Sequence, residues 1–410
     1  MVSVSSRDFI CKTFHDFYDS DSFFSPSIHR FNEREIGFFL LEKKIMVRHK
    51  RFQTIEDLTS FIKQNVPSDV YRSCAYYEYP DAEMAEKGWL GSDLVFDIDA
   101  DHISNSCDKI HDKWLCLICG FEGKGITPKE CPFCGSKKFN NKTWPCESCL
   151  DSAKEETKKL ISFLELDFGF SHTDMRIFFS GHRGYHVHVE HDAVKSLDSL
   201  ARKEIADFIT GLGVTLLNNK KTNSYSDSNI SSLGWQKRLN IGLQKFLLSA
   251  KKEDLKKAGI KTNHDAILNN KEKILNRCIM EGRWDSIKGL GTKTWEKLFQ
   301  YIKSIESSQI DTVVTTDIHR LIRMNNTLHG KTGFKKIEFP ISHIDSFDPF
   351  KEAVAFNDGN VKVCVSDVPL FRIGENMFGP YKDQKVELST AAAVLLICKE
   401  RAELVKNGNV

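Results

Sequence analysis

The sequence predicts an α+β protein whose mixed-sheet core is interrupted by a metal-binding insertion and by a helical insertion. Strand-like segments that carry aspartates and histidines lie both before and after a long helical stretch with lysine-rich faces. Seven of the twelve cysteines fall between residues 107 and 149. We expect the first part of the core at 1–195 with the metal-binding insertion at 102–150, the helical insertion at 196–310, the second part of the core at 311–345, and a β-rich tail with a terminal helix at 346–410.

Composition excludes several classes of protein. The chain contains 40% hydrophobic and 28% charged residues, which is ordinary for a globular protein. Its net charge of +2 gives no overall attraction to nucleic acid, so any basic surface must be local. No segment has the pattern of a signal peptide, and no apolar stretch approaches the roughly 20 residues that a membrane span needs. We therefore expect no membrane partner.

The elements predicted before residue 100 end in a strand that carries two neighbouring aspartates. Residues 31–40 and 44–52 predict two neighbouring strands, and 54–64 predicts a helix that begins after a threonine cap. A further strand near 93–99 places Asp97 and Asp99 on one face. Two adjacent carboxylates repel each other unless a divalent cation lies between them, and Mg²⁺ with a phosphate substrate is the usual occupant. The alternative is a strand end with solvated acids.

The cysteine-rich block contains two sets of metal ligands. Its C-x-x-C pairs have the spacing of zinc knuckles, and clustered cysteines without a secretion signal indicate metal rather than disulfides. One set is a zinc ribbon formed by Cys116, Cys119, Cys131 and Cys134. The remaining residues Cys107, His111, Cys146 and Cys149 make a second tetrahedral set, in which His102 competes with His111. Buried free thiols are the alternative. Sites closed by four protein ligands are structural, so we expect no chemistry from zinc here.

After a helix predicted at 152–168, residues 175–190 predict two short strands around a turn with two glycines. The hydroxyl, imidazole and guanidinium groups of Ser180, His182, Arg183 and His186 are suitable donors for a polyphosphate. His186 and His188 share one strand face. A histidine-rich surface without a ligand is the alternative.

A third acid is expected where extended structure returns at 311–317. On a strand, Val313, Thr315 and Asp317 would share a face, with Asp317 at the point where the strand gives way to a helix. An N-cap role is the alternative for this aspartate, and it is compatible with metal binding. The preceding residues 218–232 predict an exposed loop.

Taken together, these motifs resemble the catalytic small subunit of archaeal and eukaryotic-type DNA primases, with the archaeal form the more similar. The matching segments are REIGFF (34–39), LVFDIDA (94–100), CESCLDSAKE (146–155), FSGHRGYHVHV (179–189), VVTTDIHRLIR (313–323), LHGKTG (328–333) and FRIGENMFGPYKDQKVEL (371–388). They occur in the family's order and cover nearly the whole chain, which makes the ordered set specific.

The resemblance implies roles for individual residues. The metal-binding carboxylates fall on Asp97, Asp99 and Asp317, which would hold two Mg²⁺ or Mn²⁺ ions. Nucleotide contacts fall on Ser180, Arg183 and His186, with Arg48, Arg323 and His329 as further candidates, and His182 stands where some members carry arginine. The family's zinc knuckle corresponds to Cys107, His111, Cys146 and Cys149, and the ribbon at 116–134 resembles an insertion.

The implied function is DNA-dependent synthesis of short RNA primers, and of DNA primers if deoxynucleotides are accepted, by two-metal nucleotidyl transfer on single-stranded template. The family also implies nucleoside triphosphates as substrates, a large iron–sulfur subunit as heterodimer partner, and work at the nucleoid in the archaeal cytoplasm. A primase-polymerase or repair polymerase of the same superfamily is one alternative. A non-catalytic zinc-ribbon adaptor is another, but it leaves the aspartates unexplained. The lysine-rich face at 251–261 is either solvated or a template contact.

Overall fold

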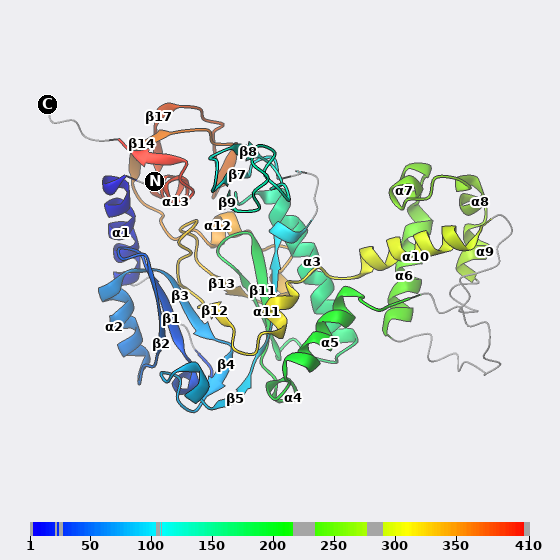
Figure 1. The fold of residues 1–410 in the computed structure, drawn as a ribbon, viewed down its shortest axis with the longest axis horizontal. Helices are drawn as coiled ribbons and strands as arrows, with labels where there is room; N and C mark the ends of the chain where they lie inside the picture. Colours follow the sequence, from blue (N-terminus) through cyan, green and yellow to red (C-terminus); the bar gives the residue numbers. More distant parts are fainter. Residues whose placement is uncertain are drawn as a thin grey trace. The chain divides into compact units, whose positions relative to one another are not determined.

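The computed structural model describes residues 3–20, 23, 28–103, 107, 109–215, 234–276 and 290–405. These form two compact units. The first comprises Met1–Glu155, His172–Arg202 and Asp311–Val410, and the second comprises Glu156–Ser171 and Lys203–Ile310. Figure 1 follows the chain through both units.

One sheet of the first unit is built on the N-terminal hairpin. Its strands β12 (Leu321–Arg323), β3 (Pro67–Ser73), β1 (Ile36–Leu40) and β2 (Ile45–Lys50) lie in that order. The predicted pairing of the first two strands is confirmed by the antiparallel β1–β2 register. The predicted helix is α2 (Ile55–Asn65), which begins with a capping box between Thr54 and Asp57. A second N-terminal helix, α1 (Val4–Asp19), buries one face.

The second sheet carries the predicted acidic strand. Its strands β13 (Ile337–Phe339), β10 (Met175–Phe179), β11 (Gly184–Val189) and β6 (Leu94–Asp99) lie in that order. Both the strand at 93–99 and the hairpin at 175–190 are therefore confirmed. A Cβ on Gly184 would lie 2.0 Å from the Ile98 carbonyl oxygen, so only glycine allows β11 to approach β6 this closely.

Every strand pair within the described residues is antiparallel, so the expectation of a mixed sheet is wrong. The reason is connectivity. The two sheets grow from hairpins, β1–β2 and β10–β11, and the added strands β3, β6, β12 and β13 also run opposite to their neighbours.

The predicted strand at 311–317 is also wrong. Residues Thr312–Thr316 form a short helix, α11, and the strand β12 follows it. The β-branched run favours a strand locally. However, the Asp311 carboxylate accepts hydrogen bonds from the Val313 and Val314 amides and so caps the helix at its start. Asp317 lies at the other end of α11, so neither the strand face nor the N-cap position applies to it.

The cysteine-rich insertion folds as a small sheet, with strands β7 (Lys113–Cys116), β8 (Glu122–Lys124) and β9 (Phe139–Lys142) in the order β8-β7-β9. Helix α3 (Glu147–Leu166) follows it and confirms the helix predicted at 152–168. The tail contains the expected strands and a buried terminal helix, α13 (Thr390–Cys398). Its other elements are α12 (Pro349–Glu352), β14 (Asn360–Val365), β15 (Phe371–Ile373), β16 (Asn376–Phe378), β17 (Gln384–Ser389) and β18 (Ala402–Leu404).

Smaller elements complete the first unit. They are the hairpin strands β4 (Ala75–Tyr77) and β5 (Trp89–Ser92), helix α4 (Asp192–Lys195), and the 3₁₀ turns Phe31–Glu33, Met84–Glu86, Ala100–His102 and Ile341–His343. The β4–β5 hairpin adjoins the strand β6 that carries the acidic pair.

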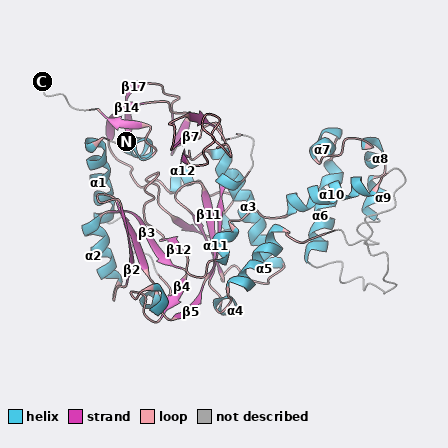
Figure 2. Ribbon diagram, in the orientation of Figure 1, coloured by secondary structure: helices cyan, strands magenta, loops and turns pink. Residues whose placement is uncertain are grey.

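The described residues of the second unit are helical, as the pattern predicts (Figure 2). Its helices include most of α5 (Ser199–Thr210), then α6 (Gly234–Ser249), α7 (Lys252–Lys257), α8 (His264–Leu268), α9 (Lys271–Leu275) and α10 (Thr292–Glu306). Within this unit, the Arg238 guanidinium donates to Asp167 and to the Ser162 carbonyl. The loop predicted at 218–232 lies outside the described residues. Among those described, no helix is both long and apolar enough to cross a membrane.

Candidate active site and metal centres

The acidic pair lies on the edge strand β6, facing the histidines of β11. Strand pairing places Asp97 opposite His186 and Asp99 opposite Gly184. The Nε2 atom of His186 lies 3.5 Å from Asp97 Oδ1. The alternate residues Phe96 and Ile98 are fully buried on the other face, so the sheet core fixes the direction of both carboxylates.

A third carboxylate near this pair comes from Asp311. The Asp311 amide donates a hydrogen bond of 2.8 Å to the Asp97 carbonyl oxygen, which anchors the start of α11 on β6. Burial, followed by the charges of Asp99 and Asp311, raises the pKa of Asp97 to about 7. Three negative charges therefore meet in a poorly solvated place, which suits a divalent cation.

Asp317, the predicted third ligand, lies at the opposite end of α11. Its Oδ1 accepts a hydrogen bond of 2.9 Å from the His319 amide. Its charge is among those that raise the pKa of Tyr77, after the larger effect of burial. In the sequence, Asp311 stands directly before a short Thr/Val run that favours a strand, so local pattern does not indicate its position beside Asp97.

Two cations offset the acidic cluster. Arg320 and Lys336 both act to lower the pKa of Asp97 against the stronger effects of burial and the neighbouring acids. Lys336 is almost fully buried, and its Nζ donates to the Arg323 carbonyl at 2.8 Å. Burial and nearby arginines hold the pKa of Lys336 well below its ordinary value. Sequence patterns did not indicate Lys336, because a lysine beside Lys335 suggests a solvated surface.

The histidines of β11 are buried rather than exposed. Burial and surrounding cations hold the pKa values of His186 and His188 well below the usual range, so both rings are neutral near pH 7. The Nδ1 atom of His186 has no hydrogen-bond partner among the described residues, and a buried polar atom of this kind favours a ligand nearby. His188 instead contacts the Arg72 guanidinium at 3.1 Å from its Nδ1 and belongs to the protein interior.

The turn between β10 and β11 is held against the segment after β12. A Cβ on Gly181 would lie 3.0 Å from the His329 Cβ, and the residue has a φ of +86°, a conformation that favours glycine. The Ser180 hydroxyl accepts from the His182 amide at 3.3 Å. His182 itself is nine-tenths buried, with Nε2 located 2.6 Å from Lys399 Nζ and 3.2 Å from Thr143 Oγ1.

Arg183 is fully buried and turned toward the metal-binding insertion. Its guanidinium donates to both oxygens of Asp112, at 2.9 and 2.8 Å, and to the Trp144 carbonyl at 3.2 Å. It also contacts Asp101. The Arg183 carbonyl accepts from the Ala100 amide at 3.1 Å, directly after β6. In this arrangement the side chain joins the end of β6 to the cysteine-rich insertion and does not face open solvent.

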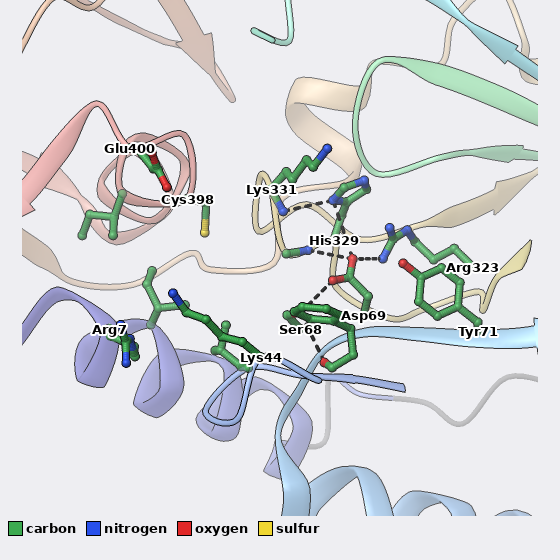
Figure 3. A pocket seen from close by; sticks show the side chains of 15 residues that line it. Arg7, Lys44, Ser68, Asp69, Tyr71, Arg323, His329, Lys331, Cys398 and Glu400 are labelled. Carbon is green, nitrogen blue, oxygen red and sulfur yellow. Dashed lines mark hydrogen bonds and ion pairs between the residues drawn. The ribbon is translucent and has the colours of Figure 1, made fainter. Parts of the chain in front are cut away.

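Arg323 and His329 line a cavity of about 550 Å³ in which cationic side chains outnumber the acids Asp69 and Glu400 (Figure 3). Other cationic side chains in its lining are Arg7 from α1, Lys44 from the β1–β2 turn, and Lys331. Apolar walls come from α1, β1 and α13. A cavity of this size and charge can hold a nucleotide.

Asp69 orders the polar end of this cavity. Its carboxylate accepts from Ser68 Oγ at 2.6 Å, from the Gly330 amide at 3.2 Å, and from Arg323. Burial alone would raise the pKa of Asp69, but Arg323 and these hydrogen bonds bring it below its ordinary value. His329 Nδ1 lies 3.9 Å from the same carboxylate. Neither Asp69 nor Lys44 was indicated by the sequence patterns, because their role depends on contacts between distant segments.

Arg48 lies on β2 outside this lining. Its guanidinium pairs with the fully buried Glu35, with Nε 3.0 Å from Oε1, and remains 37% exposed. Lys87 Nζ also lies 3.3 Å from Glu35. The structure therefore gives Arg48 a protein carboxylate as its partner.

The cysteine-rich insertion brings two sets of metal ligands together. Within each set the ligand atoms lie within 4.8 Å of one another, and the sets are Cys107, His111, Cys146, Cys149 and Cys116, Cys119, Cys131, Cys134. Sulfur atoms approach to 3.4 Å in the first set and to 3.5 and 3.6 Å in the second. These separations fit four ligands about 2.3 Å from one tetrahedral zinc ion, so each set could hold zinc. The side chain of His102 lies outside the described residues.

Comparison with known proteins gives a consistent result. Residues 136–341 match a family model described as DNA primase small subunit. A curated protein named DNA primase small subunit PriS from Archaeoglobus fulgidus is 34% identical over 402 residues, covering 95% of this chain and 96% of its own. Proteins of the same name from Cenarchaeum symbiosum and Nitrosopumilus maritimus are 32% and 30% identical. They cover 86% and 92% of this chain, and 87% and 92% of their own length.

Proposed function

This chain belongs to the DNA primase small subunit family and is the catalytic subunit of a primase, and we propose that Asp97, Asp99 and Asp311 form its metal-binding centre. The reaction is nucleotidyl transfer that makes RNA primers. The third carboxylate is placed at Asp311 rather than at Asp317, because the Asp311 amide is bound to the Asp97 carbonyl.

The convergence of three carboxylates carries this proposal. Asp97 has a pKa near 7 because it is buried beside Asp99 and Asp311, so the cluster gains stability when a cation replaces its proton. Two Mg²⁺ or Mn²⁺ ions fit such an all-oxygen ligand set. When bound, they would activate the primer 3′-hydroxyl and stabilise the charge of the leaving pyrophosphate.

Neighbouring side chains would orient the nucleoside triphosphate. His186 offers its unpaired Nδ1, and Ser180 offers a hydroxyl beside the glycine turn. Arg323 and His329 line the basic cavity and would hold phosphate oxygens. His182 would stabilise the β10–β11 turn through its contact with Lys399. Positioning of the substrates and electrostatic stabilisation of the transition state then account for the rate enhancement, and no covalent intermediate is needed.

Two predicted nucleotide contacts receive different roles in this proposal. Arg183 is fully buried on Asp112, so we assign it the task of positioning the turn and β6. Arg48 neutralises the buried Glu35 from β2, and its guanidinium, with the side chain 37% exposed, could still reach a phosphate.

The two cysteine sets would hold structural zinc, because four protein ligands close each site. The family further suggests a large iron–sulfur subunit, single-stranded DNA and nucleoside triphosphates as partners, at the nucleoid in an archaeal cytoplasm. A primase-polymerase would share the carboxylates, and a zinc-ribbon adaptor would not require them.

The test is primer synthesis on single-stranded DNA with labelled nucleotides and Mg²⁺ or Mn²⁺. Asp99→Asn is compared with the wild type and with Asp358→Asn, an exposed aspartate far from the site in sequence. De novo products from the wild type and from Asp358→Asn, but not from Asp99→Asn, are expected. If the wild type extends pre-annealed primers but makes no primers de novo, the primase-polymerase is favoured. De novo synthesis that appears when a large subunit is added would instead support the primase. No incorporation by any of the three, even with a large subunit added, would favour the adaptor.

A further inference from the structure

The zinc ribbon carries an unusual concentration of exposed apolar side chains. Leu117, Ile118, Phe121, Ile126 and Phe133, here called the ribbon surface, are all exposed, and Phe133 reaches 76%. The ribbon is a small module, yet it leaves these large side chains in water. Exposed apolar groups this close together mark a binding surface more often than chance.

The geometry of the two knuckles brings this surface together. Leu117 and Ile118 lie between the cysteines of the first knuckle, and Phe133 lies between those of the second. The sulfurs of opposite knuckles approach to 3.5 and 3.6 Å, so the two loop tips are neighbours. The rings of Phe121 and Phe133 are parallel within 5°, with centroids 6.2 Å apart.

The ribbon has a small core of its own, and Phe121 belongs to it only in part. The centre of this core is Trp114, which is 8% exposed. It packs edge-on against Phe139 with ring centroids 5.5 Å apart, and against one side of the Phe121 ring with centroids 6.0 Å apart. Gly123 lies directly over the Trp114 ring, since a Cβ there would come within 2.2 Å of it. The Phe133 ring, which is 76% exposed, and the 42% of Phe121 that is exposed are therefore available for a partner.

The charge around this surface is positive. Residues 113–142 contain six lysines and two glutamates. Lys113 and Lys124 pair with Asp367, Lys137 with Glu130, and Lys142 with Glu400. Lys129 and Lys138 make no ion pair with any described residue. A partner that covers the ribbon surface should therefore be anionic.

The ribbon is fixed to the catalytic turn at both of its ends. Asp112, directly before β7, is bound by Arg183. Thr143, directly after β9, has its Oγ1 3.2 Å from His182 Nε2. The base of the ribbon therefore lies beside the turn that we propose for nucleotide binding.

We propose that the ribbon surface binds single-stranded nucleic acid, with bases stacked on Phe121 and Phe133 and phosphates near Lys129 and Lys138. Parallel exposed rings offer flat faces to bases of any sequence, and unpaired lysines match a phosphodiester backbone. That the bound strand is the template rests on the proposed function. A protein partner is the competing occupant, and the experiment separates the two.

The test measures binding of a fluorescein-labelled 20-nucleotide oligo(dT) to the full chain by anisotropy, without nucleotides. The double variant Phe121→Ala/Phe133→Ala is compared with Leu200→Ala/Leu212→Ala, which removes two leucines that are 65% and 64% exposed elsewhere. We expect the phenylalanine variant to bind about tenfold more weakly and the leucine variant to match the wild type. Lys129→Gln/Lys138→Gln should lower the slope of log Kd against log salt by about 1 to 2.

Zinc content and thermal unfolding confirm that each variant is folded. Unchanged oligo(dT) affinity in both ribbon variants would overturn the proposal, and loss of binding to a large subunit with normal DNA affinity would reassign the surface to a protein. Failure of the proposed function is recognised separately. In one outcome, the wild type incorporates no nucleotide while the phenylalanine variant still loses DNA affinity. That result would support nucleic-acid binding by the ribbon surface and contradict the proposed function.

Discussion

The Arg183 guanidinium donates hydrogen bonds to both carboxylate oxygens of Asp112, at 2.9 and 2.8 Å, with the arginine fully buried. The same carboxylate lies 2.7 Å from His111 Nδ1 and accepts from the Trp144 amide at 2.8 Å. One acid therefore connects the β10–β11 turn to a predicted zinc ligand. Carboxylates that bind the second nitrogen of a metal-ligating histidine orient its ring and strengthen metal binding.

We predict that Asp112→Asn weakens both zinc binding and folding. Removing one partner of a buried ion pair costs about 3 to 5 kcal/mol, and losing the partner of a metal-ligating histidine lowers metal affinity about 10- to 100-fold. Zinc competition with a chelator and denaturant unfolding measure the two effects. Asp367→Asn is the matched control, because Asp367 is 43% exposed and, among the described residues, its carboxylate pairs with Lys113 and Lys124. Equal losses in both variants would contradict the role given to Asp112.

The two aspartates that flank α11 should behave differently. Asp311→Asn is expected to reduce nucleotide incorporation by at least about 10²-fold, because it removes a charge that acts on Asp97 in the metal centre. Asp317→Asn should stay within a few-fold of the wild type, since this residue caps the far end of the helix. Single-turnover incorporation at saturating Mn²⁺ compares them. The reverse order of effects would restore Asp317 as the ligand.

The contrast between these aspartates shows what local patterns can and cannot predict. Alternation placed Asp97 and Asp99 on one face of β6, and knuckle spacing grouped both cysteine sets, because such signals are contained within a few residues. The short helix α11 could not be predicted from its β-branched run, because its cap and its anchor on the Asp97 carbonyl depend on tertiary contacts. The buried lysines Lys336 and Lys399 were missed for the same reason.

Gly184 is predicted to tolerate no side chain. A Cβ there would lie 2.0 Å from the Ile98 carbonyl oxygen, so Gly184→Ala must separate β11 from β6. We expect a loss of about 3 kcal/mol or more, seen by calorimetry as a fall of roughly 5 °C or more in the Tm of the first unit. Gly291→Ala is the control, because its φ is −76° and no heavy atom of a described residue lies within 4 Å of a Cβ there. Gly291 is the N-cap of α10, so this change should cost no more than about 1 kcal/mol. An unchanged Tm for Gly184→Ala would contradict the close strand pairing.

The pKa of Asp97 makes stability depend on pH in a predictable direction. Its folded pKa of about 7 lies above the ordinary value of 3.8, so between these values the folded chain holds a proton that the unfolded chain has lost. Stability therefore falls as pH rises toward 7. Asp97→Asn removes this penalty. Without added Mg²⁺ or Mn²⁺, we expect the variant to gain about 2 kcal/mol over the wild type between pH 5.5 and pH 8, because the window spans roughly 1.5 pKa units.

Denaturant unfolding of zinc-loaded protein at both pH values measures this difference. Adding Mn²⁺ at pH 8 should stabilise the wild type and leave Asp97→Asn almost unchanged, because only the wild type has the full carboxylate set. The wild type should also bind Mn²⁺ more weakly below pH 7, where the ion must displace a proton from Asp97. A stability difference independent of pH would show that Asp97 ionises normally, and the argument for a cation held between Asp97, Asp99 and Asp311 would lose its electrostatic basis.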